Sequence, residues 1–277
     1  MITPRIRQDL KGSDMIHKAG KPLLFISMLG ENDLFNPKHF EGLCSSGQEK
    51  DWIVDWFGPV AQETGFSLTS VDICRGDALP KVEDVDCVIL GGTMHVVTED
   101  RPWLQALYAW LGLYRDAGKP LLGICGGHQL VSTEFEDGVL DGRAGGTLAG
   151  TYEIELTDFG RRHPLFDGLR TPPRFNFANY LHVIPSDAQK AKALARIGES
   201  SAICIDHGDH WYTTQFHPES RRSVWSCMYE RTEPEHVGNY SDDQDGAELI
   251  RNFMKIAASA LDERRQATSN QSGQCGR

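Results

Sequence analysis

The chain has 277 residues, a formal net charge of −11 at pH 7 and seven cysteines. This length suits one large α/β domain or two small domains, and it is enough to bury most of the surface of the unfolded chain. The acidic balance argues against nucleic acid or an anionic membrane as the main partner, and no apolar run approaches the ~18 residues that span a bilayer.

The ends of the chain and its cysteines bear on its location. Residues 1–7 are polar and lack the apolar core of a signal peptide. The cysteines are odd in number and scattered, with no C-x-x-C pair, which favours a reducing, cytoplasmic compartment over a disulfide framework. We expect residues 18–262 to form a single domain, and residues 1–17 and 263–277 to be flexible tails.

Strand and helix patterns alternate along the first half of the chain. Short apolar runs predict strands, and apolar side chains at helical spacing predict amphipathic helices. The predicted strands cover residues 23–28, 66–73, 87–90 and 121–124, and the predicted helices cover residues 51–63 and 102–116. Repeated β–α units predict a parallel sheet covered on both faces, with ligands at the carboxyl ends of its strands.

The most informative stretch follows the strand at residues 121–124. Cys125 stands between Gly123 and Gly127, in the sequence Gly-Ile-Cys-Gly-Gly-His-Gln, and a helix pattern begins directly behind it. Small residues on both sides permit a strained turn that lifts the side chain clear of the sheet, as in a nucleophile elbow. The N-terminus of a helix also favours a thiolate. Cys125 is therefore the predicted nucleophile.

A candidate base lies in the sequence Gln-Phe-His-Pro-Glu at residues 215–219. In extended backbone, residues two apart point the same way, so His217 and Glu219 share a face. A carboxylate in that position fixes the tautomer of the imidazole and stabilises its protonated form. With Cys125, these two residues predict a triad of nucleophile, base and orienting group.

After about residue 138 the pattern shifts towards β structure. Strands are predicted at residues 151–156, 202–205 and 211–216. Residues 206–209 predict a hairpin turn between the last two strands. Residues 230–245 are polar and predict an exposed insertion, after which a closing helix begins near residue 249. His207 and His210 lie near His217 in the sequence, but turn histidines are commoner than ligands, so we predict no metal site.

The motif around Cys125 and the motif with His217 and Glu219, in this order and with this separation in the sequence, resemble those of the class I (triad-type) glutamine amidotransferases. The resemblance covers roughly residues 20–260, and it is greatest to the stand-alone, GMP-synthase-like group. It implies an α/β fold of three layers, flavodoxin-like, with a mostly parallel central sheet and a smaller antiparallel portion in the C-terminal half. It also implies that Cys125 is the nucleophile, His217 the base and Glu219 its partner.

The resemblance assigns an oxyanion hole as well. In the family, the glycine-rich loop after the strand at residues 87–90 offers a backbone N–H to the oxyanion, together with the N–H of the residue after the cysteine. Those donors are Gly92 and Gly126 here. Thr93 departs from the family, which usually has Pro or Ser at this position, and a plain strand-to-helix turn is the alternative interpretation of the loop.

Three residues are predicted to bind the substrate. Gln129 matches a family position that lines the glutamine pocket, whereas the helix pattern alone makes it an ordinary exposed residue. Residues 175–182 correspond to a segment near the rim of the site in related domains, which makes Asn179 and Tyr180 candidates. The pattern alone makes this segment a partly exposed strand.

The resemblance predicts hydrolysis of a γ-glutamyl amide, glutamine to glutamate and ammonia, through a thioester on Cys125. No synthetase domain fits in this length and no P-loop is present, so an ammonia acceptor would belong to a separate synthetase partner. Two alternatives stay open: a stand-alone γ-glutamyl peptidase or amide hydrolase, and a catalytically silent binding module. We expect no cofactor, no nucleic-acid partner and no membrane partner.

Overall fold

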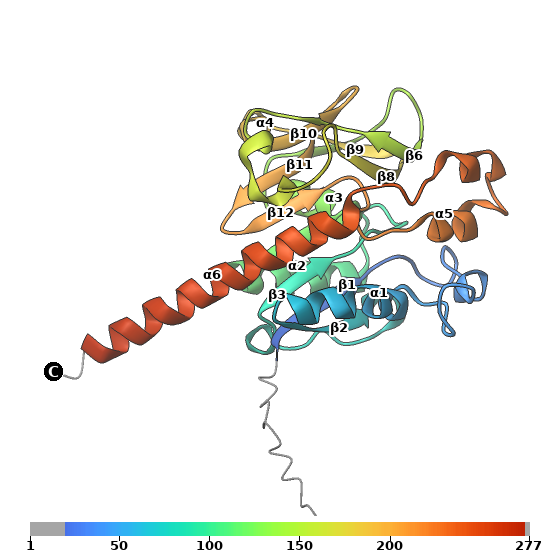
Figure 1. Cartoon of the computed structure of the whole chain (residues 1–277). Helices are drawn as coiled ribbons and strands as arrows, with labels where there is room; N and C mark the ends of the chain where they lie inside the picture. Colours follow the sequence, from blue (N-terminus) through green and yellow to red (C-terminus); the bar gives the residue numbers. More distant parts are fainter. Residues whose placement is uncertain (1–19, 275–277) are drawn as a thin grey trace, which may run out of the picture.

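A single eight-stranded sheet runs through the centre of the structure, a computed structural model that describes the backbone of residues 20–274 and the side chains of residues 20–267. The strand order is β2-β1-β3-β4-β12-β11-β10-β7 (Figure 1). The parallel part consists of β2 (Phe66–Asp72), β1 (Lys21–Ser27), β3 (Cys87–Leu90), β4 (Leu121–Ile124) and β12 (Trp211–Thr214). The antiparallel part consists of β11 (Ser200–Gly208), β10 (Ala193–Ile197) and β7 (Glu155–Leu156).

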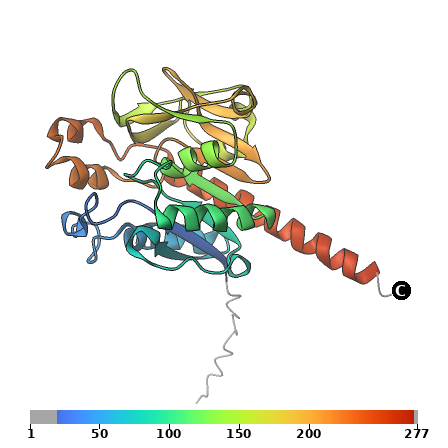
Figure 2. The same ribbon diagram turned by 180° about the vertical axis from the view of Figure 1, so that it is seen from behind.

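Helices cover both faces of this sheet (Figures 1 and 2). One face carries α1 (Glu49–Glu63) and α6 (Gly246–Gln274), and the other carries α2 (Pro102–Asp116) and α3 (Gly126–Glu134). Strand β1 shows why, because its apolar side chains alternate between the faces. Leu23 and Phe25 pack in the cluster that contains α1 and α6, whereas Leu24 and Ile26 pack in the cluster that contains α2 and α3. The predicted three-layer α/β fold with a mostly parallel sheet is confirmed.

Two smaller antiparallel sheets lie in the second half of the chain, as predicted. Strand β5 (Val139–Gly142) pairs with β9 (Leu181–Ile184), and β6 (Leu148–Glu153) pairs with β8 (Arg174–Asn179). The remaining α-helices are α4 (Asp187–Ala191) and α5 (Arg222–Tyr229). Short 3-10 helices cover Pro37–Phe40, Ile73–Arg75, Val82–Asp84, Gly160–Arg162, Pro164–Phe166 and Pro234–Asn239.

The structure differs from the predicted elements in three strands. Residues 175–182, which the pattern predicts as one partly exposed strand, belong to the mostly buried β8 and β9, which lie in different sheets on either side of the exposed Tyr180. Residues 151–156 belong to two strands, since β6 and β7 pair in different sheets on either side of Ile154. Strand β11 continues through Gly208, so the hairpin turn lies at Asp209 and His210 rather than at residues 206–209. Both turn residues have positive φ, of 51° and 62°, which is the geometry that a two-residue hairpin turn requires.

The segment at residues 230–245 is not simply an exposed insertion. Its Tyr240 is buried and stacks on Trp225 of α5, with ring centroids 5.0 Å apart. Tyr240 also donates its hydroxyl to Phe177 O at 2.7 Å. One buried aromatic residue thus fastens a polar segment to β8 and α5, and a polar composition does not reveal such a contact.

The C-terminal end of the described chain is a long helix. Helix α6 begins at Gly246 and continues to Gln274, so residues 263–274 are helical where the sequence predicts a flexible tail. The predicted tail at residues 1–17 lies outside the described residues.

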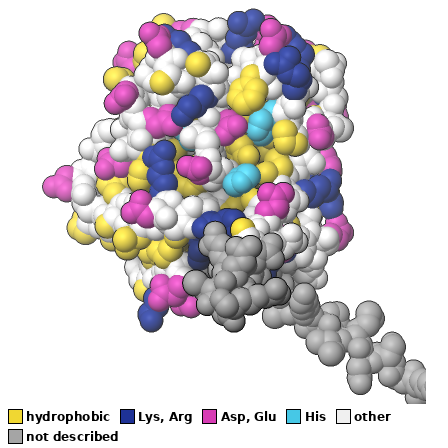
Figure 3. Space-filling model, turned by 90° about the vertical axis from the view of Figure 1, so that its left-hand side faces the viewer, with side chains coloured by type: hydrophobic (Ala, Val, Ile, Leu, Met, Phe, Trp, Pro, Cys, Tyr) yellow, Lys and Arg dark blue, Asp and Glu magenta, His cyan; other side chains and the backbone are white. Residues whose placement is uncertain are grey.

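None of the helices in residues 20–274 is long and apolar enough to cross a membrane. On the face shown in Figure 3, acidic and basic side chains are interspersed.

We expect Gly127→Ala to destabilise the protein. A β-carbon at Gly127 would lie 2.7 Å from the backbone oxygen of Leu90, and overpacking of this kind costs about 1–3 kcal/mol. Gly112 in α2 is the control, because nothing lies within 4 Å of a β-carbon built there. Gly112→Ala should be neutral or stabilising by up to about 1 kcal/mol, since alanine favours a helix. Urea unfolding measures both free energies, and equal values would contradict the packing argument.

Candidate active site

A strained turn is present where the sequence predicts a nucleophile elbow. Cys125 has φ 49° and ψ −99°, and α3 begins at the next residue. A positive φ is uncommon outside glycine and costs about 1–3 kcal/mol, so the surroundings must enforce it. Cys125 N donates to Thr214 O at 2.7 Å, and Gly127 N donates to Gly91 O at 3.2 Å. The turn is therefore held from two neighbouring strand ends.

The two glycines that flank the turn permit a close crossing of strand and helix. A β-carbon at Gly123 would lie 2.9 Å from the carbonyl atoms of Gly127, and one at Gly127 would lie 2.7 Å from Leu90 O. Real β-carbons do not approach backbone this closely, so the geometry requires glycine at both positions. The side chain of Cys125 stands above this crossing, at the carboxyl end of β4.

His217 and Glu219 are brought to the same end of the sheet. Strand β12 runs parallel to β4, so the segment that follows β12 lies beside Cys125. His217 N donates to Asn176 O at 2.8 Å, which anchors the segment to β8. His217 Nδ1 lies 2.8 Å from Glu219 Oε1, and these residues are 7% and 6% exposed. The pair has the geometry of a base with its orienting carboxylate.

The electrostatic surroundings favour a protonated His217. Burial alone lowers the pKa of His217, because it penalises the imidazolium. The carboxylate of Glu219 and the thiolate of Cys125 act in the opposite sense and prevail, so the pKa of His217 is raised well above its usual value. His217 Nε2 has no hydrogen-bond partner among the described residues. This nitrogen is therefore free to exchange a proton with a reactant.

The predicted oxyanion donors lie against the reacting groups. A β-carbon built on Gly92 would be 3.1 Å from His217 Cε1 and 3.5 Å from Cys125 Cβ, so Gly92 touches both side chains. Gly126 is the first residue of α3 and lies against both the side chain and the backbone nitrogen of Thr93. Within residues 20–274, no acceptor bonds the N–H of Gly92 or Gly126. Gly92 thus borders the same cavity as the thiol, and Gly126 directly follows the nucleophile in the chain.

The three predicted substrate residues line one cavity with Cys125. Gln129 is buried, unlike the exposed residue that the helix pattern predicts, and its Nε2 donates to Leu181 O and to Gln215 Oε1, both at 3.3 Å. Asn179 Nδ2 donates to Leu181 O at 2.9 Å, while Asn179 Oδ1 is buried without a partner in the described part of the chain. Tyr180 is 53% exposed at the rim.

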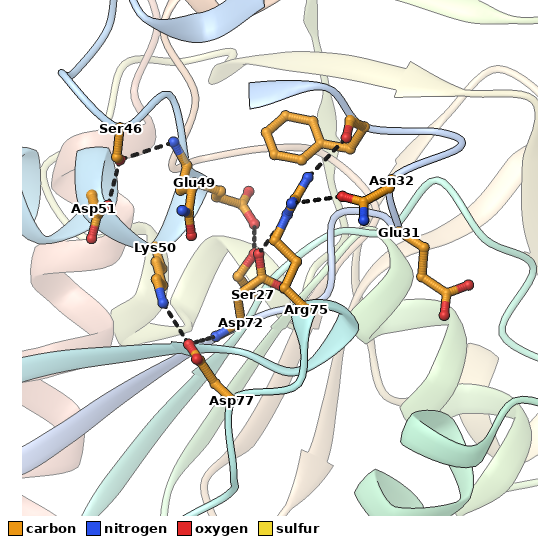
Figure 4. A network of polar contacts seen from close by, with 12 residues as sticks. Ser27, Glu31, Asn32, Ser46, Glu49, Lys50, Asp51, Asp72, Arg75 and Asp77 are labelled. Atoms are coloured by element: carbon orange, nitrogen blue, oxygen red, sulfur yellow. Dashed lines mark hydrogen bonds and ion pairs between the residues drawn. The ribbon is translucent and has the colours of Figure 1, made fainter. Parts of the chain in front are cut away.

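Two further residues of the site were not predicted from the sequence. Gln215 donates from Nε2 to Cys125 Sγ at 3.6 Å and connects it to Gln129. Its spacing of two residues from His217 is the signal that could have identified it. Glu49 borders a cavity with His217 and Glu219 and accepts a 2.7 Å hydrogen bond from Ser27 (Figure 4). An acidic residue in the first turn of a helix is ordinary, so the sequence carries no signal for Glu49.

The histidines considered for a metal site do not form one. His207 Nε2 lies 2.8 Å from Thr213 Oγ1, and His207 Nδ1 lies 3.1 Å from Glu136 Oε2. These contacts place His207 in a separate buried cluster. Throughout the described residues, no group of three or more His, Cys, Asp or Glu side chains is arranged to hold a metal ion.

Comparison with known proteins gives a family and several relatives. The sequence model of the family "Glutamine amidotransferase class-I" matches residues 62–232, more than half of the chain. A GMP synthase [glutamine-hydrolyzing] of Aeropyrum pernix is 32% identical over 161 residues, which are 57% of this chain and 28% of that protein. The imidazole glycerol phosphate synthase subunit HisH of Syntrophotalea carbinolica is 30% identical over 127 residues, 39% of this chain and 61% of that protein. The matches span less than two thirds of either relative.

Solved structures share the fold. The crystal structure of a glutamine amidotransferase from Thermotoga maritima matches with a TM-score of 0.64 at 17% identity, and the match covers 86% of this chain and 98% of the other. A glutamine amidotransferase from Methylobacillus flagellatus matches with a TM-score of 0.61 at 14% identity, over 88% and 95% of the two chains. At these identities the likeness shows the fold alone.

Glu49→Gln should change how stability depends on pH. Burial is the main cause that raises the pKa of Glu49 from 4.5 to about 8. An acid whose pKa is higher in the folded state stabilises the fold fully below its unfolded pKa, and this contribution is lost as the pH rises through the folded value. The Tm of the wild type should therefore fall relative to Glu49→Gln between about pH 4.5 and pH 8. A constant difference in thermal unfolding across this range would contradict the burial of an ionisable carboxyl.

Proposed function

Because the chain belongs to the class-I glutamine amidotransferase family, we propose that it hydrolyses a γ-glutamyl amide, converting glutamine to glutamate and ammonia. The observation that supports this best is the position of Cys125, on a strained turn beside the buried pair of His217 and Glu219. This arrangement matches the requirements of nucleophilic catalysis, in which a thiolate needs an adjacent base held by a third group.

In the first half of the reaction, the thiolate of Cys125 attacks the γ-carbonyl carbon. The N–H groups of Gly92 and Gly126 hold the negative oxygen that forms, and removal of one such donor typically costs about 3–4 kcal/mol of transition-state stabilisation. The C–N bond then breaks as His217 donates its proton to the departing nitrogen. The products are the amine and a γ-glutamyl thioester on Cys125.

In the second half, neutral His217 takes a proton from water as the oxygen attacks the thioester carbon. The C–S bond breaks, glutamate leaves, and Cys125 returns as a thiolate beside protonated His217. Glu219 holds Nδ1 of the ring and stabilises the imidazolium in both halves. The raised pKa of His217 fits this resting state, because it keeps the ring protonated next to the thiolate.

The cavity of Gln129, Asn179 and Tyr180 is the proposed site for the rest of the γ-glutamyl group. The buried and unpaired Asn179 Oδ1 supports this, since an ammonium group of the substrate would satisfy it. Leu181 O already accepts from Asn179 and Gln129 and so fixes both amides. Tyr180 closes the rim, where its exposure allows the ring to contact the outer end of the substrate.

The fate of ammonia divides the proposal in two. One relative is, by name, one subunit of imidazole glycerol phosphate synthase, which supports a glutaminase that delivers ammonia to a synthetase partner. The apolar cavity beside His217 supports the second candidate, a stand-alone γ-glutamyl peptidase or amide hydrolase, because its walls would contact the apolar part of a substituted amine. The test is whether the purified chain alone releases glutamate from glutamine. Release would show that the chain is a catalyst and would exclude a silent binding module.

The cellular location proposed for this chemistry is the cytoplasm. The six cysteines in the described part of the chain are all unpaired. Cysteines in this state agree with a reducing compartment. Residues 18–262 form the proposed catalytic domain.

Cys125→Ala is expected to abolish release of glutamate from glutamine. A diazo-ketone analogue of glutamine should label the wild type once per chain, because Cys125 is placed at the end of the substrate cavity. Cys227→Ala is the control, since Cys227 is more accessible than the buried Cys125 but lies in α5. It should be labelled like the wild type. Mass spectrometry gives the stoichiometry, and labelling that persists in Cys125→Ala would refute the assignment.

Asn179→Ala should lower kcat/KM for glutamine by on the order of tenfold, the effect of losing one hydrogen bond to a charged group. Alkylation of Cys125 by a small haloacetamide should proceed at the wild-type rate, since the thiol and its base are intact. Tyr180→Ala should change kcat/KM less, because the side chain is 53% exposed. If neither variant alters the relative rates on glutamine and other γ-glutamyl amides, this segment does not contact the substrate.

A further inference from the structure

Cys125 lies between two cavities of different chemistry. The first is the cavity of Gln129 and Asn179 described above. The second, which we call the leaving-group cavity, contains His217, Glu219 and Glu49 among apolar side chains. Those apolar side chains are Leu29, Trp52, Met94, Ala178, Val224, Trp225 and Met228.

The position of His217 decides which part of the substrate enters the leaving-group cavity. Nε2 of His217 must reach the nitrogen that departs, and His217 borders this cavity but not the first one. The departing nitrogen therefore lies in the leaving-group cavity, whereas the remainder of the γ-glutamyl group points towards Asn179. The amine that leaves as the thioester forms is thus held among apolar walls, close to the carbonyl carbon that it has just left.

Glu49 is the one carboxyl of this cavity that the proposed reaction does not use. It lies in the first turn of α1 and is 5% exposed. Its Oε2 accepts a hydrogen bond from Ser27 Oγ at 2.7 Å, and its Oε1 has no partner among the described residues. Ser220 Oγ donates to His217 O and Thr93 Oγ1 accepts from His95 N, whereas His217 Nε2 and Glu219 Oε2 have no hydrogen-bond partner in the described part of the chain.

The surroundings keep Glu49 neutral at physiological pH. Burial raises the pKa of Glu49 to about 8, and the carboxylates of Glu219 and Asp72 add to the rise, while Ser27 and His217 oppose it. The nearby cationic side chains are paired with carboxylates other than Glu49 (Figure 4). Arg75 Nε lies 3.6 Å from Asp72 Oδ2, and Lys50 Nζ lies 2.6 Å from Asp77 Oδ2. A carboxylic acid with an available proton therefore faces the space into which the amine is released.

We propose that Glu49 is a second acid of this site, which protonates the amine after His217 has expelled it and so prevents the amine from attacking the thioester again. The step is a proton transfer from Glu49 to neutral ammonia or amine, giving a carboxylate and an ammonium ion with no other bond changed. The ammonium ion has no lone pair with which to attack. When it leaves, Glu49 regains its proton from solvent. This inference rests on the second proposed candidate, the stand-alone hydrolase, since an ammonium ion could not act as the nucleophile of a synthetase partner, and it concerns the reversal of the hydrolysis.

The test measures how the thioester divides between water and an added amine. Purified full-length protein is given glutamine and nitrogen-15-labelled ammonium, and the ratio of labelled glutamine to glutamate is measured by mass spectrometry. Glu49→Gln cannot donate this proton, so its ratio should exceed that of the wild type by on the order of tenfold. Asp51→Asn is the matched control, because Asp51 lies in the same first turn of α1 but does not border the cavity. Its ratio should equal that of the wild type.

Hydroxylamine, used in place of ammonium, distinguishes a loss of proton transfer from easier access of amines to the thioester. It is too weakly basic to take a proton from Glu49, but it attacks thioesters readily, so Glu49→Gln should leave the ratio of hydroxamate to glutamate unchanged. An equal rise with both amines would overturn the proposal, because it would mean that the substitution only opened the cavity. An unchanged ratio with ammonium would overturn it as well.

A measurement on the wild type keeps the proposal testable if Glu49→Gln does not fold. Transfer to labelled ammonia, divided by the concentration of free ammonia, should rise as the pH passes about 8, the pKa of Glu49. A flat profile would refute the proton transfer. If the wild type releases no glutamate from any γ-glutamyl amide, the proposed hydrolysis itself fails, which is a different outcome from hydrolysis that Glu49 does not affect.

Discussion

The site depends on the close approach of the turn at Cys125 to the end of strand β3. Gly127 N donates to Gly91 O, and the missing side chain of Gly127 leaves room for Leu90 O. This contact joins two parallel strands at their carboxyl ends and places Gly92 against Cys125 and His217. A larger residue at this crossing would separate the nucleophile from its donors before it altered any reacting group. The steric constraint on one glycine therefore determines the geometry of the whole site.

Much of this architecture could be predicted from local sequence patterns. Strands β3 and β4 and helix α2 have the predicted bounds, because short apolar runs and a proline at a helix start define them without help from distant residues. Glu49 and Tyr240 could not be predicted. Each is polar or lies in a polar segment, and each becomes buried through contacts with residues far away in the sequence, such as Ser27 and Phe177. Burial that arises from tertiary packing produces no periodic pattern of apolar residues in the sequence.

Two carboxyl groups share one cavity but differ in environment. Glu219 has the imidazole of His217 at 2.8 Å, a partner that stabilises its negative charge. Glu49 has a neutral hydroxyl, apolar walls and other carboxylates around it, so its charged form is disfavoured. When neighbouring carboxyls experience such different surroundings, one stays ionised and the other holds a proton. A single small cavity thus contains both a carboxyl that is paired with the base and a carboxyl that can donate a proton.

The aromatic stack behind His217 has a consequence for spectroscopy. The ring of His217 meets the indole of Trp225 with its centroid 4.8 Å away, and Trp225 in turn stacks on Tyr240. An excited indole transfers an electron to imidazolium far more readily than to neutral imidazole. The emission of Trp225 should therefore be dim while His217 carries its proton and brighter once the proton has gone to the leaving group. The protein thus contains an optical reporter of the protonation of its own base.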